Sequence, residues 1–116
     1  MTKSELSTIL NTLDIPVGEG EHFIDSRESM PKIAYWEYVW KDVMSSGDDY
    51  DMIVTYQISF VSTKPRDAQL LALKTALNDA GLHPDFYHEY VKSDNAPGYF
   101  HSYCSVDLEE WFDAEQ

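Results

Sequence analysis

The sequence predicts an α+β fold in which an antiparallel sheet of about four strands carries two main helices on one face. Three features lead to this prediction: a strand-like segment at residues 51–62, a leucine-periodic segment directly after it, and two later segments rich in aromatic residues. The expected order of elements is helix, hairpin, helix, hairpin. A chain of 116 residues is long enough for one hydrophobic core and too short for two, so we expect a single domain over residues 1–116.

The segment at residues 51–62 is expected to be the central strand. The residues on one face of its pleat are apolar, namely Met52, Val54, Tyr56, Ile58 and Phe60. Thr55, Gln57 and Ser59 fall on the other face, and this alternation is typical of a strand with one buried face. The aromatic and β-branched segment at residues 32–41 precedes it across the turn-forming residues 45–49, so the two segments are expected to form an antiparallel hairpin.

Two segments have the spacing of amphipathic helices. Residues 4–13 place leucine and isoleucine three and four positions apart, and residues 65–80 do the same. We expect Thr63 to cap the second helix, Pro65 to occupy its first turn and Gly81 to end it. The expected buried stripe of this helix consists of Leu70, Leu73, Leu77 and Ala80.

The remaining segments are less regular. Pro16, Gly18 and Gly20 predict a break in regular structure, and the acidic span 19–28 is expected to be a loop whose Phe23 and Ile24 pack back onto the core. The second hairpin is expected to pair residues 85–92 with residues 99–108 across the turn at 93–98. The acidic end, residues 109–116, is expected to be a short helix or a tail.

The charge balance narrows the classes of partner. The chain has 21 acidic and 8 basic residues and a formal net charge of −13. Phosphate backbones are bound by clustered lysine and arginine, so this balance argues against direct nucleic-acid binding. An acidic surface can serve solubility, repel DNA from a passage, or imitate DNA in order to block a basic partner. No apolar stretch approaches the roughly 20 residues of a membrane span, and we expect no membrane association.

Few residues are candidates for chemistry. His83, His88, His101 and Cys104 are the residues to consider, but His101 and Cys104 are three apart on a predicted strand and therefore fall on opposite faces. That geometry disfavours a shared metal ion. His88 and His101 can meet across the second hairpin only in one register, which the sequence does not reveal. We therefore predict no catalytic, cofactor or metal site and no enzyme activity.

The single cysteine excludes an internal disulfide bond and favours a reducing compartment. Val106 and Leu108 share the strand face of Cys104, which predicts an apolar setting. Burial in such a setting keeps a thiol protonated. We expect Cys104 to be buried and unreactive.

Three stretches of the chain resemble a known family: PKIAYWEYVW, YQISFVSTKPRDAQLLALKTAL and GLHPDFYHEYVKSDNAPGYFHSYCSVDLE. They look like the small tail-associated proteins of long-tailed bacteriophages and prophages, which are called tail terminator, tail completion, head-tail joining or minor capsid proteins. In that family, a strand of the form apolar-x-Tyr-x-Ile-x-Phe leads into a helix that begins near Lys-Pro-Arg-Asp. A second hairpin rich in tyrosine and glutamate then closes the sheet. The resemblance covers roughly residues 30 to 110.

The resemblance implies a virion protein of the phage tail that is assembled in the host bacterial cytoplasm. Its partners would be itself in a ring, commonly a hexamer, the tail tube protein and the head-tail connector protein. The ring caps the tube, ends its polymerisation and offers a surface to the head connector. The family has no catalytic residues to carry over.

Aromatic and acidic residues supply the site predictions. The interface candidates are Trp36, Tyr38 and Trp40, which share one face of the predicted strand, and Trp111 and Phe112 near the acidic end. Trp111 and Phe112 can instead pack on the chain's own core. The candidates for lining a DNA passage are Glu19, Glu21, Asp48, Asp49 and Asp51. The alternative functions are an acidic DNA-mimic inhibitor and a monomeric protein-protein adaptor.

Overall fold

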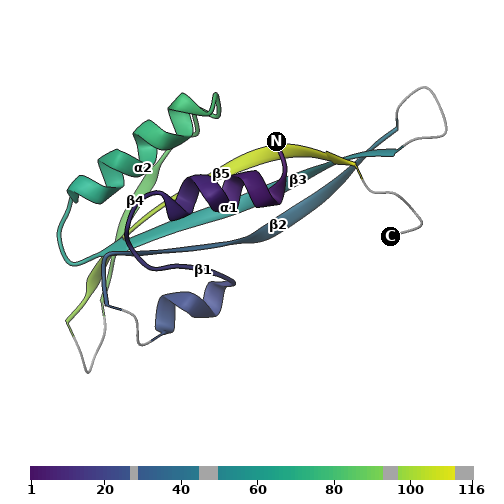
Figure 1. The fold of residues 1–116 in the computed structure, drawn as a ribbon. Helices are drawn as coiled ribbons and strands as arrows, with labels where there is room; N and C mark the ends of the chain where they lie inside the picture. Colours follow the sequence, from purple (N-terminus) through teal and green to yellow (C-terminus); the bar gives the residue numbers. More distant parts are fainter. Residues whose placement is uncertain (27–28, 45–49, 93–96, 112–116) are drawn as a thin grey trace.

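The computed structural model describes residues 1–26, 29–44, 50–92 and 97–111 (Figure 1). Its elements are the helices α1 (Lys3–Asn11) and α2 (Ala68–Asp79), the short 3-10 helix η1 (Glu21–Asp25), and the strands β1 (Val17–Glu19), β2 (Lys32–Met44), β3 (Tyr50–Ser62), β4 (Tyr87–Val91) and β5 (Tyr99–Trp111). The strands form one sheet in the order β1-β2-β3-β5-β4. The chain is elongated, with extents of 54 × 29 × 21 Å.

The α+β class is confirmed, but the sheet has five strands and is mixed, whereas about four antiparallel strands were expected. The additional strand is β1, which pairs in parallel with β2. It falls in the segment whose Pro16 and Gly18 predicted a break. Pro16 instead accepts a hydrogen bond from the Ile33 N–H through its carbonyl, and Gly18 leaves room for the Phe23 ring, which a side chain at position 18 would overlap.

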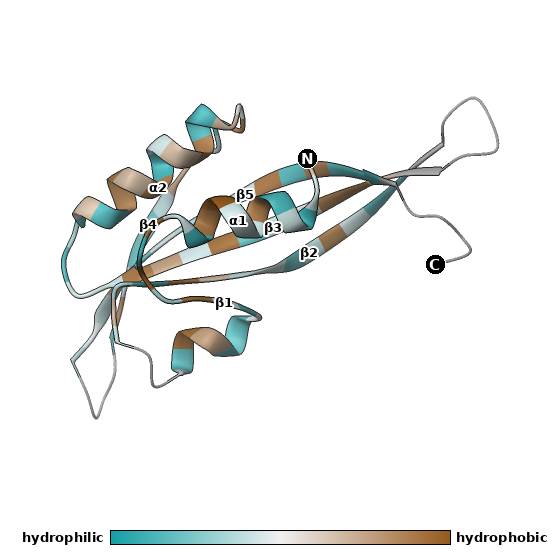
Figure 2. Cartoon of the chain, viewed as in Figure 1, coloured by the Kyte–Doolittle hydropathy of each residue, from teal (hydrophilic) through white to brown (hydrophobic). Residues whose placement is uncertain are grey.

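Both helices lie on one face of the sheet, as predicted (Figure 1). The core combines leucines of the helices with one face of β2, β3 and β5, and its fully buried members include Leu6, Leu10, Ile33, Val54, Tyr56, Ile58, Leu73 and Leu77. Figure 2 shows hydrophobic segments on both helices and on the strands beneath them. The predicted alternation of the central strand is therefore confirmed, since Val54, Tyr56 and Ile58 face this core.

The beginning of α2 differs from the prediction. Asp67 caps the helix, because its Oδ1 accepts a hydrogen bond of 2.8 Å from the Gln69 N–H. Thr63 is not the cap, and Pro65 precedes the helix instead of lying in its first turn. The helix begins at Ala68, so Asp67 directly precedes it and takes the role predicted for threonine, whereas Thr63 lies five residues before the helix. The end is as predicted, since Gly81 adopts a φ of 84° directly after the last turn.

The chain from residue 109 to residue 111 continues β5 and is neither a helix nor a tail. Glu110 shows why this segment stays in the sheet. Its Oε1 accepts from the Lys3 N–H at 3.2 Å, and its Oε2 accepts from the Tyr56 hydroxyl at 2.9 Å. Burial and this hydrogen bond both raise the pKa of Tyr56 well above its ordinary value. Residues 112–116 lie outside the described residues, as do most residues of the turns predicted at 45–49 and 93–98.

The buried stripe of α2 generates a stability prediction. Leu73 and Leu77 are fully buried, whereas Leu71 in the same helix is 54% exposed. Leu73→Ala or Leu77→Ala is expected to lower the free energy of unfolding by about 2 to 5 kcal/mol, because each leaves a cavity. Leu71→Ala is the matched control and is expected to change it by less than about 0.5 kcal/mol. Chemical denaturation measures both, and equal effects at positions 71 and 73 would contradict the packing.

Candidate functional site

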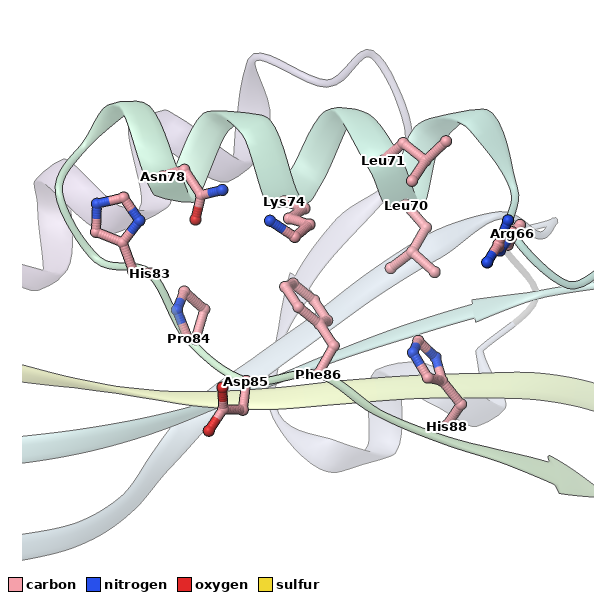
Figure 3. A pocket seen from close by; sticks show the side chains of 10 residues that line it. All are labelled: Arg66, Leu70, Leu71, Lys74, Asn78, His83, Pro84, Asp85, Phe86 and His88. Atoms are coloured by element: carbon pink, nitrogen blue, oxygen red, sulfur yellow. The ribbon is translucent and has the colours of Figure 1, made fainter.

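A pocket of about 500 Å³ lies between α2 and the segment that leads into β4 (Figure 3). A second pocket, of about 440 Å³, lies between residues 64–66 and the β4-β5 pair. Arg66 and His88 border both pockets, so the two pockets adjoin, and we call them together the α2–β4 groove. Its cationic and histidine side chains are Lys64, Arg66, Lys74, His83 and His88, its acids are Asp85 and Glu89, and its apolar lining includes Leu70, Leu71, Phe86 and Phe100.

The backbone at the two ends of α2 is unusual and borders this groove. Arg66 has a φ of 50° and His83 a φ of 39°, in the left-handed region that residues other than glycine seldom adopt. Arg66 directly precedes the cap residue Asp67, and His83 follows the last turn of α2. Figure 3 shows the side chains of Arg66 and His83 at opposite ends of the first pocket, with Leu70 and Phe86 between them. Such strain often accompanies binding sites.

The two histidines of the second hairpin do not meet. His88 pairs with Ser102 and Glu89 pairs with His101 in the β4-β5 ladder. The Nδ1 of His88 lies 2.7 Å from the Ser102 hydroxyl on the helix-bearing face. His101 is one position away from Ser102 and therefore points to the other face of the sheet. The register of the β4-β5 pair, which the sequence does not reveal, thus places His88 and His101 on opposite faces of the sheet.

His101 instead forms a chain of hydrogen bonds across three strands. Its Nδ1 lies 2.8 Å from the Glu89 Oε1, and its Nε2 lies 2.9 Å from the Ser59 Oγ. Because a carboxylate only accepts hydrogen bonds, the imidazole donates from Nδ1 to Glu89, and its Nε2 shares a hydrogen bond with the Ser59 hydroxyl. The connectivity is that of a serine-histidine-acid triad. The sequence did not indicate it, because the three residues meet only through the register of β3, β4 and β5.

The accessibility of Ser59 argues against nucleophilic chemistry at this place. Its exposed fraction is 0%, and it lies on the central strand between Ala34 of β2 and Tyr103 of β5. A nucleophile must reach the carbon that it attacks, and in this conformation the Ser59 hydroxyl contacts only protein. The hydrogen-bonded chain therefore ties β3, β4 and β5 together.

Aromatic rings surround His101 on the face away from α1 and α2. Tyr103 lies 4.9 Å from His101 and 5.7 Å from Tyr87, measured between ring centroids. Tyr87 is among the most exposed aromatic residues in the described part of the chain. This face of β4 and β5 therefore presents aromatic surface to solvent next to a sheet edge.

Cys104 lies on the helix-bearing face opposite Ile58 and is 1% exposed. Burial raises the pKa of its thiol to about 12. The predictions that Cys104 is buried and that it faces away from His101 are confirmed. A protonated, enclosed thiol has little nucleophilic reactivity.

The aromatic residues of β2 do not share one face, so this prediction was wrong. A β-bulge between Glu37 and Val39 shifts the register. Trp36 pairs with Gln57, whereas Trp40 pairs with Val54, which points to the opposite side of the sheet.

Two of the five interface candidates are strongly exposed. Tyr38 at the bulge is 64% exposed and Trp40 is 57% exposed, whereas Trp36 is half-buried. Trp111 is the last residue of β5, and Phe112 lies outside the described residues. Bulges re-aim side chains, and this one turns Trp36 and Trp40 to different surfaces.

The predicted passage acids lie at different ends of the sheet. Glu19 lies in β1 and forms an ion pair of 2.6 Å with Lys3, and Glu21 is exposed in η1. Asp51 pairs with Val43 near the far end of β2. Asp48 and Asp49 lie outside the described residues. Since Glu19 is opposite Tyr35, eight residues from Val43, roughly 26 Å of strand separates Glu19 from Asp51.

The sequence matches no family model and no curated protein. Within the described ranges, no helix is long and apolar enough to cross a membrane. Across the same ranges, no group of three or more histidine, cysteine, aspartate or glutamate side chains is arranged to hold a metal ion.

The buried thiol generates a prediction about alkaline stability. An unfolded cysteine ionises near its ordinary pKa of 9.0, whereas the folded thiol stays protonated up to about 12. The unfolded state therefore releases its proton first, and stability falls as pH rises above 9. Between pH 9 and pH 10 this loss amounts to about 1 kcal/mol. Denaturation of Cys104→Ala at both pH values is expected to show a loss smaller by that amount, and an equal loss in both proteins would contradict the assignment.

The hydrogen bond between Ser59 and His101 generates a second prediction. Ser59→Ala removes a buried hydrogen-bond partner of His101 and is expected to lower the free energy of unfolding by about 1 kcal/mol. Because the hydroxyl is enclosed, hydrolysis of a small activated ester by the native chain is expected to be the same in the variant. Loss of ester hydrolysis in Ser59→Ala, with folding retained, would show that Ser59 is a nucleophile.

Proposed function

We propose that this chain is a structural protein of a bacteriophage tail, which assembles as a ring, caps the tail tube, ends its polymerisation and joins it to the head connector. The resemblance of residues 30 to 110 to tail-associated proteins supports the class. The observation that carries the assembly role is the free edge of β4 at the end of the sheet.

The edge strand β4 is suited to contact with another chain. It pairs with β5 on one side, and among the described strands none pairs with its other side. Natural proteins usually protect such an edge with lysine, proline or a covering segment. β4 has the sequence Tyr-His-Glu-Tyr-Val, without lysine or proline, and its first four residues are exposed. Unpaired N–H and C=O groups at an edge can accept a further strand from another molecule.

The two edges of the sheet are unlike, and this favours a head-to-tail contact. One edge is the five-residue antiparallel strand β4, and the other is the three-residue parallel strand β1. A contact that joins β4 of one copy to a different surface of the next copy is heterologous. Heterologous contacts close into rings when their rotation divides a full turn, and six copies are the number that the resemblance implies.

The long strands offer a second contact surface. β2, β3 and β5 each have 13 residues and extend beyond the helices, as Figure 1 shows. Tyr38 and Trp40 are exposed on β2, and exposed aromatic residues are frequent anchors of protein interfaces. In the proposed assembly, this surface contacts the tail tube protein or the head connector protein.

The acidic balance of the chain fits a conduit for DNA. In the proposed ring, acids close to the passage repel the phosphates of the duplex, within a screening length of about 8 Å at physiological salt. Glu19 and Asp51 would act at different heights, because roughly 26 Å of strand separates them. Glu21, Asp48 and Asp49 are the other acids assigned to this role. The ion pair of Glu19 with Lys3 reduces the contribution of Glu19 to this repulsion.

The assembly role predicts that lysines on the β4 edge prevent ring formation. Tyr87 and Tyr90 are 58% and 52% exposed, so the double variant Tyr87→Lys/Tyr90→Lys is expected to fold. Edge lysines oppose strand pairing. Sedimentation, with and without purified tail tubes, is expected to show rings for the natural chain and monomers for the variant.

The matched control for this experiment is Thr75→Lys, on the exposed surface of α2. It adds the same type of charge on a helix instead of on the edge strand and is expected to assemble normally. A natural chain that stays monomeric at millimolar concentration and does not bind tail tubes would overturn the proposed function.

A further inference from the structure

The α2–β4 groove concentrates positive charge in a strongly acidic chain. Three of the eight lysine and arginine residues line it, namely Lys64, Arg66 and Lys74, together with His83 and His88. The acids that line it are Asp85 and Glu89, and Glu89 is already bonded to His101 on the other side of the sheet. The groove is therefore a basic site on a protein whose net charge is −13.

The groove cations have no acidic partner within the part of the chain that the structure describes. The ion pairs found there involve Lys3 and His101, and none involves Lys64, Arg66 or Lys74. Arg66, whose φ is 50°, borders both pockets. Unpaired cations beside a cavity attract an anionic group from another molecule.

The apolar side chains of the groove indicate that a matching ligand has an apolar part as well as a negative charge. Leu71 is 54% exposed beside Lys74, and Leu70 and Phe86 lie between Arg66 and His83 (Figure 3). Phe100 and Tyr90, whose ring centroids are 5.0 Å apart, border the second pocket. A ligand that combines carboxylates with an aromatic ring would satisfy both the cations and the apolar lining.

We infer that the α2–β4 groove binds the acidic segment that follows β5 in a neighbouring copy of this chain. This segment, residues 112–116, has the sequence Phe-Asp-Ala-Glu-Gln, with one aromatic ring and two carboxylates in five residues. Its charge is opposite to that of the groove. The inference rests on the proposed function, since it assigns the contact that joins consecutive copies of the ring.

The part of the groove around Arg66 and His88 requires a second copy, whereas His83 and Asp85 at the other end border a pocket with Asp107, four residues before Trp111. His88 in the groove is opposite Ser102 of β5, and Trp111 lies nine residues further along the same strand, a distance of roughly 30 Å. Residues 112–116 span at most roughly 18 Å when fully extended. The segment therefore cannot reach Arg66 and His88 of its own chain. A neighbour placed head to tail can bring it there.

The test is a charge exchange in the full-length chain. The groove variant is Arg66→Glu/Lys74→Glu, and the segment variant is Asp113→Lys/Glu115→Lys. Each variant alone is expected to weaken self-association by about tenfold or more, measured by sedimentation, because it opposes like charges. An equimolar mixture of the two variants places reversed segments opposite reversed grooves and is expected to form mixed dimers that neither variant forms alone. Lys41→Glu is the matched control, since it removes an exposed lysine outside the groove.

A direct binding measurement complements the exchange. A labelled peptide of residues 108–116 is expected to bind the full-length natural chain, more weakly at high salt, and to bind Arg66→Glu/Lys74→Glu at least tenfold more weakly. Lys74→Glu alone provides a second variant, should the double change disturb folding.

The outcomes separate this inference from the proposed function. If rings form on tail tubes while both charge variants assemble normally and the peptide does not bind, the groove assignment is wrong and the ring function stands. If the peptide binds but the natural chain forms no rings and does not bind tail tubes, the groove assignment stands and the proposed function is wrong. Binding of an unrelated acidic peptide with equal affinity would overturn the assignment of this particular segment.

Discussion

The structure depends on the pairing of β3 with β2 on one side and with β5 on the other. β3 is the central strand of the sheet, and its apolar face meets leucines of both helices. Alternate positions along β3 define the two faces, so a slip of one residue would move Tyr56 and Ile58 from the core to the opposite side. The same pairing decides that Cys104 is enclosed and that His101 meets Ser59.

The helices cover one face of this sheet, and this arrangement forms the groove and the free edge at the β4 end. α2 crosses above β4 and leaves the groove between them, while β4 itself remains an edge strand. Three cations without acidic partners in the described chain and an apolar lining therefore lie beside unpaired backbone groups. These neighbouring features support assembly with further copies as a role for this end of the molecule. β2, where Tyr38 and Trp40 are exposed, offers a surface to a different partner.

Much of the fold could be predicted from local patterns in the sequence. Alternation identified the central strand, the leucine spacing identified the buried face of α2, and Gly81 identified its end. β1 could not be predicted, because Gly18 serves the packing of the Phe23 ring, which is a tertiary contact. The residue that caps α2 could not be predicted either, because Thr63 and Asp67 are both suitable cap residues and the sequence does not show at which of them the helix begins. In the structure the cap is Asp67.

The candidate site was harder to predict, because it depends on register. The bulge at Tyr38, which turns Trp36 and Trp40 to different faces, has no glycine or proline to indicate it. The chain of hydrogen bonds from Glu89 through His101 to Ser59 joins three strands that are up to 42 residues apart in sequence. Lys64, Arg66 and Lys74 lie within eleven residues of the sequence, but only the placement of α2 above β4 gives them a groove to line.

Amide hydrogen exchange, compared between the free chain and the chain assembled on tail tubes, tests most directly whether the β4 end is the assembly surface. In the free chain, we expect the slowest exchange in β3, because it is paired on both sides and buried beneath the helices. On assembly, residues 87–91 of β4 and residues 64–66 are expected to gain protection. Protection gained only in the extension of β2 and β3, with β4 unchanged, would contradict the assignment of β4 and its groove as the contact between copies.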